Sequence, residues 1–216
     1  MGFFDKKDCA LCGGKAGRFI NYKLVNGEYM CADCRNRMSD HTEDISDMTL
    51  EEVKEQIRLK EENDARYQNE FEATRVFELD GNHKLMAVDD NRAEFVLLEE
   101  KNPTIFSFDQ IMDFKVDLHT KVMSQEEQKK NAGLNGLMSF FKSEEYLSRY
   151  PELPNCPAGC KIVGMYFRIR LGENPFRAGK LEIKMLQGWS GYKTEVENAY
   201  RCADEIYRCI QEYKEG

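Results

Sequence analysis

Four cysteines near the N-terminus have the side-chain type and spacing that bind a metal ion. Cys9 and Cys12 form one C-x₂-C pair, Cys31 and Cys34 form another, and 18 residues separate the two pairs. Thiolates at this spacing are typical of a tetrahedral zinc site. Four protein ligands leave no coordination position for water, so the sequence predicts one structural zinc ion and no hydrolytic centre.

Short elements must position these cysteines, because residues 1–38 hold few large apolar side chains and need a metal to fold. Asn26-Gly27 lies between two short extended stretches, which predicts a type I′ hairpin. Arg35–Met38 follows as the start of a short helix. A cysteine turn, a hairpin and a helix start resemble a treble-clef finger, and a plain zinc ribbon is the alternative.

Residues 39–70 are expected to be an acidic linker with a helix. Thr49 and Glu52 form a capping-box pattern, which predicts a helix over about residues 50–68. Leu50, Val53 and Ile57 give this helix one apolar face. The apolar stripe ends after Leu59, so we expect the second half of the helix to be solvated and the helix to act as a spacer.

From residue 71 the hydrophobic period changes to two, which indicates β-strands. Seven stretches are expected as strands: Phe71–Leu79, Lys84–Val88, Glu94–Leu98, Thr104–Phe108, Met112–His119, Ile162–Leu171 and Leu181–Leu186. An insertion occupies about residues 120–160. Apolar side chains at three- and four-residue steps predict a helix over about 192–214.

The chain is therefore expected to be α+β, with a Cys₄ zinc finger (1–38), a helical linker (39–70) and a β-domain (71–216). Seven antiparallel strands and a final helix favour a barrel or strongly bent sheet with one end closed by the helix. This is the pleckstrin-homology architecture.

The motifs Cys9-x-x-Cys12-Gly13, Asn26-Gly27 and Cys31-x-x-Cys34 resemble a bacterial zinc-finger domain of unknown function found at protein N-termini. In such proteins a short helix often leads to a pleckstrin-homology-like domain. Four later segments are similar to that second domain: Phe71–Val76, Phe106–Phe114, Ile169–Leu171 and Ser190–Tyr192. The resemblance implies zinc binding and a pairing of domains, and it implies no activity.

The other cysteines and the histidines give weaker evidence for a metal, redox or catalytic site. Cys156 and Cys160 are two thiols without a further pair, so they are interpreted as ordinary loop cysteines. Cys202 and Cys209 lie about 10 Å apart on the expected helix and are interpreted as half-buried packing residues. The histidines are His41, His83 and His119; His41 is expected in a solvated loop and His119 on the polar face of a strand. No catalytic Ser/His/Asp or Cys/His arrangement is legible, so we expect no enzyme activity.

Arg168, Arg170 and Lys184 alternate on one face of the expected sheet. They either hold a phosphorylated ligand or pair across strands with Glu182 or Asp113, and pairing is the favoured interpretation. The apolar stretch Leu134–Phe141 in the insertion either docks a partner, touches a membrane surface or packs against its own barrel, and packing is the default.

The formal net charge is −8, and residues 39–70 carry four Lys/Arg against eleven Asp/Glu. The start of the chain has no secretory signal pattern and no run of 18 apolar residues occurs, so we expect a cytoplasmic protein without membrane contact. These features favour a non-catalytic adaptor whose partner is another protein. The alternative is nucleic-acid binding through basic residues of the finger, namely Lys15, Arg18, Lys23, Arg35 and Arg37.

Overall fold

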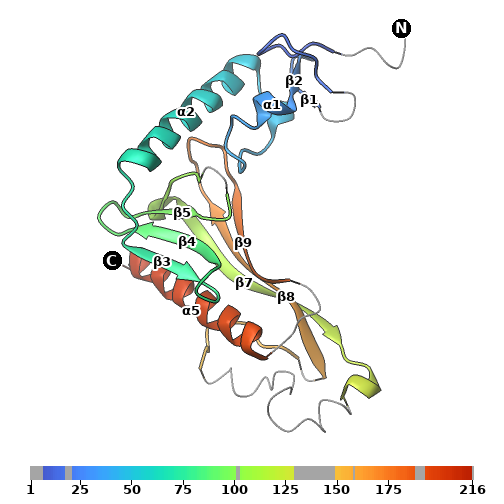
Figure 1. The fold of residues 1–216 in the computed structure, drawn as a ribbon, viewed down its shortest axis with the longest axis vertical. Coiled ribbons are helices and arrows are strands. Elements are labelled where there is room, and N and C mark those ends of the chain that lie inside the picture. Colours follow the sequence, from blue (N-terminus) through green and yellow to red (C-terminus); the bar gives the residue numbers. More distant parts are fainter. Residues whose placement is uncertain are drawn as a thin grey trace. The chain divides into compact units, whose positions relative to one another are not determined.

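The computed structural model describes residues 7–17, 21–100, 103–128, 149–157, 159–187 and 193–215. The chain forms two compact units (Figure 1). The N-terminal unit comprises Met1–Phe71, Glu100–Ile105 and Leu171–Gly179; the C-terminal unit comprises Glu72–Glu99, Phe106–Arg170 and Lys180–Gly216. The N-terminal unit is therefore assembled from three separate stretches of the chain.

The N-terminal unit begins with a hairpin of two short strands, β1 (Asn21–Lys23) and β2 (Tyr29–Cys31), which pair antiparallel. The hairpin was predicted correctly, but the predicted type I′ turn is wrong. The N–H of Gly27 donates to the carbonyl of Leu24 at 3.0 Å, and Gly27 has a φ of 86° whereas Asn26 does not have a positive φ. A type I′ turn needs positive φ at both central residues; this geometry is that of a three-residue loop with a glycine bulge.

Three helical elements follow the hairpin: α1 (Ala32–Arg35), the 3₁₀ turn η1 (Ile45–Asp47) and α2 (Leu50–Asn69). The predicted capping box of α2 is present. The N–H of Glu52 donates to the Thr49 hydroxyl at 3.3 Å, and the N–H of Thr49 donates to the Glu52 carboxylate at 2.7 Å. Two N–H groups that a helix start leaves unpaired are thereby satisfied.

The N-terminal unit has one hydrophobic core, to which α2 contributes Val53 and Ile57. The core also contains cysteines and other apolar side chains, namely Cys9, Ala16, Leu24, Met30, Cys31, Cys34, Met38 and Met48. Burying a side chain such as Val53 or Ile57 stabilises the fold by about 1.5–3 kcal/mol. The first half of α2 is thus part of the same core as the cysteines.

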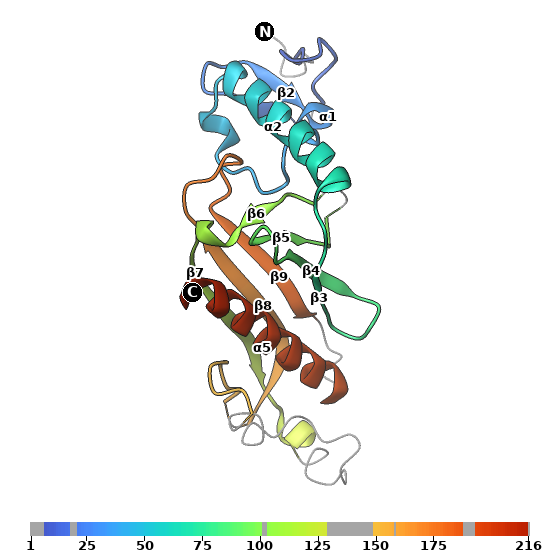
Figure 2. The ribbon, with the colours of Figure 1, turned by 90° about the vertical axis from the view of Figure 1, so that its left-hand side faces the viewer.

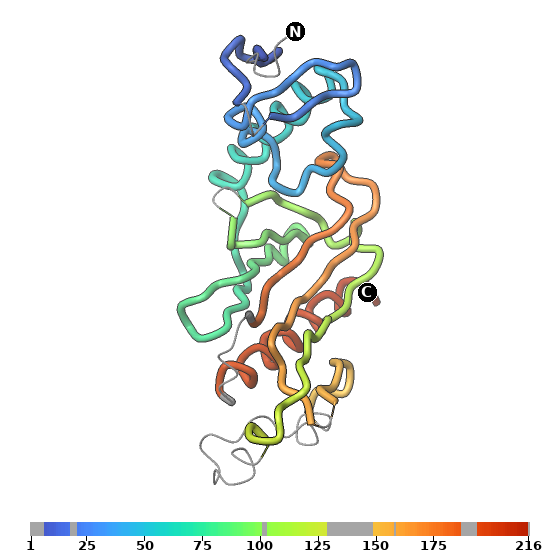
Figure 3. Tube along the Cα trace, turned by 90° about the vertical axis from the view of Figure 1, so that its right-hand side faces the viewer, coloured from blue at the N-terminus to red at the C-terminus, as the bar shows by residue number. Residues whose placement is uncertain are grey.

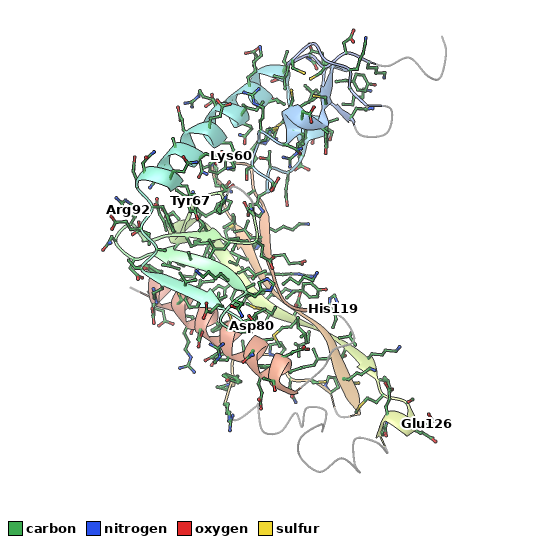
Figure 4. The ribbon with its side chains drawn as sticks, in the orientation of Figure 1. Lys60, Tyr67, Asp80, Arg92, His119 and Glu126 are labelled. Atoms are coloured by element: carbon green, nitrogen blue, oxygen red, sulfur yellow. The ribbon has the colours of Figure 1, made fainter. Side chains whose placement is uncertain are left out.

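The second half of α2 was expected to be solvated, and this prediction holds for most of its residues but is wrong for two of them. Lys60 (labelled in Figure 4) and Asn63 are 4% and 7% exposed. Both continue the three- and four-residue steps of Val53 and Ile57, but with polar side chains. Lys60 forms an ion pair with Asp64, which compensates the burial of its charge.

Two loops from later in the chain complete the N-terminal unit. The Asn63 side chain donates to the carbonyl of Pro103 at 3.0 Å and accepts from the N–H of Ile105 at 2.8 Å. The Gln56 side chain donates to the carbonyl of Pro175 at 2.8 Å. These loop backbones supply hydrogen-bond partners for the buried amide groups of Asn63 and for the side-chain N–H of Gln56.

In its described residues, the C-terminal unit contains two sheets. The four-stranded sheet has the order β3 (Arg75–Glu78), β4 (Lys84–Asp89), β5 (Glu94–Leu97) and β6 (Phe106–Ser107), and its neighbours are antiparallel. The three-stranded sheet has the order β7 (Ile111–Val122), β8 (Cys160–Leu171) and β9 (Lys180–Gln187). Figure 3 shows β7 and β8 continuing past the end of β9, which pairs only with Gly164–Arg170 of β8.

The α+β prediction is confirmed, but the single seven-stranded barrel or bent sheet is wrong. Each of the seven expected stretches holds a strand, yet in the described residues the strands of the chain form three separate sheets and no closed barrel. The break between β6 and β7 has a local cause. β6 has two residues and the chain then turns through the 3₁₀ element η2 (Phe108–Gln110), which interrupts the ladder.

The last helix, α5 (Lys193–Glu215), contacts β3, β7, β9 and η2 (Figure 2). Its buried residues include the predicted stripe of Val196, Ala199, Ala203, Ile206 and Ile210. Tyr192, which was expected to begin the stripe, and the apolar stretch Leu134–Phe141 lie outside the described residues. No helix among the described residues is long and apolar enough to cross a membrane.

Candidate metal centre

The first cysteine pair lies in a tight backbone turn. The N–H of Cys9 donates to the carbonyl of Gly14 at 2.7 Å, and the N–H of Gly13 donates to the carbonyl of Cys9 at 2.8 Å. Gly13 has a φ of 71°, a conformation that side chains with a Cβ rarely adopt. The glycines after Cys12 therefore let the chain close around the two thiols.

The second pair lies where a strand passes into a helix. Cys31 ends β2 and occupies the N-cap position of α1, and Cys34 lies on α1 itself. The N–H of Ala10 donates to the carbonyl of Tyr29 at 2.8 Å, which ties the first cysteine turn to β2. A cysteine turn, a hairpin and a helix start therefore follow one another in the order that the sequence predicted.

These elements bring all four predicted ligands together. The sulfur atoms of Cys9, Cys12, Cys31 and Cys34 lie within 4.8 Å of one another. The distances from Cys9 to Cys34 and from Cys12 to Cys31 are 3.7 and 3.8 Å between Sγ atoms. A disulfide would require about 2.05 Å, and all four are free thiols. The four cysteines are thus positioned to bind a metal ion.

The donor set fits zinc. Ligand sulfurs about 2.3 Å from a zinc ion lie about 3.8 Å from one another in a regular tetrahedron, close to the two distances above. Cys9, Cys31 and Cys34 are buried, and Cys12 is exposed. Four soft thiolate donors suit zinc and do not suit magnesium or calcium.

The electrostatics of the cluster favour a bound cation. Burial raises the pKa of Cys9, but N–H groups of Cys12, Cys31 and Leu11 outweigh burial and hold the pKa at about 6. The N–H of Cys31 lies 3.3 Å from the Cys9 sulfur. Burial, and then the neighbouring cysteines, raise the pKa of Cys34. A divalent cation would compensate the crowding of negative charge that opposes ionisation of all four thiols.

The other cysteines are not part of this cluster. Cys156 is buried, with its Sγ 3.5 Å from the carbonyl of Cys160, and burial raises its pKa to about 11. Within the described residues, Cys156 and Cys160 are not part of any group with three metal-ligand side chains. Cys202 and Cys209 are 0% and 1% exposed in α5, so they are core residues and not half-buried as predicted.

The three histidines lie apart from the cysteine cluster. His41 forms a pair with Glu100, and its side chain is only 17% exposed, so the prediction of a solvated loop residue is wrong. His83 lies 3.2 Å from Glu99 and is largely exposed. His119, labelled on β7 in Figure 4, packs against the ring of Tyr166 at 4.7 Å between ring centroids.

The basic residues proposed for nucleic-acid contacts are mostly engaged within the protein. Arg35 donates to the carbonyls of Ser39 and Asp40 at 2.9 and 3.2 Å. Arg37 forms an ion pair with Glu61 at 2.7 Å, and Lys15 forms one with Asp8. Lys23 is exposed, and Arg18 lies outside the described residues. Three of the five side chains thus have partners in the folded chain.

The four cysteine ligands could be predicted from the sequence. The residues of α2 that bind loops from later in the chain could not. Gln56 and Asn63 on α2 bind the loop backbones at Pro175 and Ile105. The available signal was their spacing, because both positions extend the helical period of Val53 and Ile57.

Comparison with known proteins gave one match. Residues 7–56, which are 50 of the 216 residues, match the family described as Domain of unknown function (DUF4428). The matched range contains all four cysteines and every residue of the N-terminal core except Ile57. No curated protein and no solved structure matched the chain. The family match and the cysteine cluster together fit an N-terminal zinc-binding module.

Proposed function

We propose that this chain is a non-catalytic interaction module that holds one structural zinc ion and acts as an adaptor for another protein. The main support for this proposal is the cluster of four thiols whose sulfur atoms lie within 4.8 Å of one another. With four cysteine ligands, no coordination position is left for a substrate or a reactive water. The zinc ion would then contribute folding free energy to the small N-terminal core and no chemistry.

The surface that the zinc-bound segment offers to a partner is the tip of its hairpin. Val25 at this tip is 59% exposed. The N–H of Val25 donates to the carbonyl of Met48 at 3.1 Å, and the N–H of Leu24 donates to the carbonyl of Glu28 at 2.9 Å. An apolar side chain held on a hydrogen-bonded backbone loses little entropy on binding, which suits recognition.

We infer a pleckstrin-homology-like relationship for the C-terminal unit. A four-stranded sheet, a three-stranded sheet and a final amphipathic helix follow one another in chain order, and this succession supports the inference.

The cytoplasm is the proposed location, because reduced thiols and thiolate-bound zinc persist in a reducing compartment. Nucleic-acid binding by the N-terminal segment has less support, because Arg35, Arg37 and Lys15 have partners within the protein.

The test uses the full chain as bait in lysate of the native cell, together with metal analysis. Wild type and Val25→Ser should each contain about one equivalent of zinc, and the double variant Cys9→Ser/Cys34→Ser should contain none. A specific partner should co-purify with wild type and be lost with Val25→Ser. Val122→Ser is the matched control, because Val122 is 73% exposed but lies on β7.

Each outcome decides a different part of the proposal. Capture of the same proteins by wild type, Val25→Ser and the cysteine variant would contradict a role for the zinc-bound segment. Wild-type protein without zinc after purification in zinc-containing buffer would contradict the metal assignment.

A further inference from the structure

The strands β8 and β9 present a charged face opposite the face that packs into the core. Their register places Phe167 opposite Ile183 and Ile169 opposite Leu181, and all four side chains are buried. The alternate pairs lie on the other face: Tyr166 opposite Lys184, Arg168 opposite Glu182, and Arg170 opposite Lys180. Five of these side chains are Arg, Lys or Glu.

Arg168, at the centre of this face, is neutralised. It forms ion pairs with Glu182 at 2.8 Å and with Asp117 of β7 at 2.6 Å. The predicted cross-strand pairing with Glu182 is confirmed for Arg168 but not for Arg170 or Lys184, and Asp117 takes the place expected of Asp113. Lys115 also contacts Asp117, at 3.0 Å. The carboxylates of Glu182 and Asp117 are therefore already engaged.

Arg170 and Lys180 are a cross-strand pair of like charge. Directly opposed side chains in antiparallel strands have Cβ atoms about 4.5–5.5 Å apart, and like charges there destabilise the sheet. Among the described residues, neither side chain makes an ion pair or a hydrogen bond. A carboxylate at either position would stabilise the pair. A local arrangement that works against folding without a compensating contact is typical of a functional surface.

Lys184 is the third cation of this face without an ion pair in the described part of the chain. It lines a cavity of about 380 Å³ together with three carboxylates, namely Asp80, Glu99 and Glu195, and apolar residues of β9. The nearby carboxylates reduce the positive potential around Lys184. The positive centre of the face is therefore the pair Arg170 and Lys180, with Lys184 as a weaker site along the same strand.

We infer that Arg170, Lys180 and Lys184 form the docking face for an acidic, extended segment of a partner protein. The inference rests on the proposed interaction function and adds the chemistry of the partner. Charge complementarity supports this inference, because Arg170 and Lys180 are not neutralised and share one face with Lys184 in a protein with a net charge of −8.

The spacing of these cations fits an extended peptide. Lys180 and Lys184 are four residues apart on one strand, so their Cα atoms lie about 13 Å apart. An extended peptide repeats its side chains on one face with the same period, so acidic residues at positions i and i+4 match the two lysines. Arg170 opposite Lys180 strengthens one end of the site.

The test measures binding of a fluorescent octapeptide of alternating Glu and Ser to the zinc-loaded full chain by fluorescence polarisation. The same peptide with Gln in place of Glu is the ligand control. Lys180→Glu should weaken binding about tenfold or more, and Lys184→Gln should weaken it less than Lys180→Gln. Lys23→Glu is the matched control, because it makes the same charge change on an exposed lysine of β1.

Stability separates a binding role from a structural one. Lys180→Glu places a carboxylate opposite Arg170, so its midpoint of thermal unfolding should rise while peptide binding is lost. A lower midpoint together with lost binding would assign Lys180 to folding and overturn the inference.

Three further results would also overturn it. These are no binding of the Glu peptide, equal binding of the Gln peptide, and stronger binding of oligothymidine or inorganic phosphate than of the Glu peptide. If Lys180→Glu captures the cellular partner as well as wild type does while Val25→Ser does not, the proposed function stands and the docking face is wrong.

Discussion

The side-chain amide of Asn63 accepts a hydrogen bond from the backbone N–H of Ile105 at 2.8 Å, and it donates to the neighbouring carbonyl of Pro103 at 3.0 Å. Asn63 is 7% exposed. One buried amide therefore joins α2 to a loop 40 residues away in the chain, at a site where water cannot replace a lost partner.

Asn63→Ala should destabilise the protein by about 1–3 kcal/mol, because it leaves a buried N–H and a buried carbonyl unpaired. Urea unfolding followed by circular dichroism measures the change. Asn69→Ala on the same helix is the control, since its side chain donates to Ala65 at an exposed site and should change stability by less than about 0.5 kcal/mol. Equal effects of the two variants would contradict a special role for Asn63.

Removal of the metal should unfold the N-terminal unit and spare the C-terminal unit. Zinc chelation, or the variant Cys9→Ser/Cys34→Ser, would remove the proposed zinc ion, which we expect to stabilise the core around Met30. Hydrogen exchange of the full chain should become faster at backbone amides of residues 21–57, and also at Ile105, whose N–H is held by Asn63.

Strands β4 and β5 provide the internal control for that measurement, because they belong to the C-terminal unit. Their amides should exchange at unchanged rates. Uniform acceleration across the chain would show that the two units unfold together.

The hydroxyl of Tyr213 should contribute to the docking of α5. Its ring stacks on Phe108 with 3.9 Å between centroids, and its hydroxyl donates to Asp90 at 2.5 Å. Tyr213→Phe keeps the ring and removes the hydrogen bond, so we expect a loss of about 0.5–1.5 kcal/mol by urea unfolding. Tyr67→Phe is the control, because the Tyr67 ring packs on Phe71 and should tolerate the loss of its hydroxyl.

Asp89 should make the C-terminal unit sensitive to acid. Its side chain is fully buried and accepts hydrogen bonds from the N–H groups of Glu72 and Asn91 and from Arg92. Burial opposes ionisation of Asp89, but these donors outweigh it and lower its pKa. A carboxylate whose pKa is lowered by folding stabilises the fold above its unfolded pKa of about 3.9, and this stabilisation is lost as the pH falls through the folded pKa.

Asp89→Asn should therefore cost about 1–3 kcal/mol at pH 7 and progressively less below pH 4. Urea midpoints of wild type and variant from pH 7 to pH 3 test this convergence. The exposed Asp40→Asn is the control and should give parallel curves. A constant gap between wild type and Asp89→Asn would mean that the variant acts through packing and not through charge.

Local patterns made much of this protein predictable. The cysteine pairs, the capping box of Thr49 and the alternation of β7, β8 and β9 are each encoded within a few residues, so the sequence contained the whole signal. The grouping of strands into two sheets was not predictable in this way. It depends on the short β6 and the turn at Phe108–Gln110, and neither changes the alternating pattern on which the strand predictions depended.

Long-range polar contacts were hidden for a different reason. Asn63 and Lys60 look like solvated helix residues, because their burial depends on partners that local sequence does not reveal. Asn63 is satisfied by the 100–105 loop and Lys60 by an ion pair with Asp64. Polar residues at core-facing helical positions are the only trace that such contacts leave in a single sequence.

The assembly of the N-terminal unit from three stretches of chain also sets an order for folding during synthesis. The cysteines and α2 leave the ribosome first, but Leu171–Gly179 emerges about 100 residues after Phe71. At about 5–20 residues per second, the unit waits on the order of 5–20 s for its last segment. Until then Gln56 lacks the carbonyl of Pro175 as its hydrogen-bond partner, whereas the partners of Asn63 at Pro103 and Ile105 have already emerged. The N-terminal unit is therefore completed in two steps, and the second comes only after most of the C-terminal unit has been made.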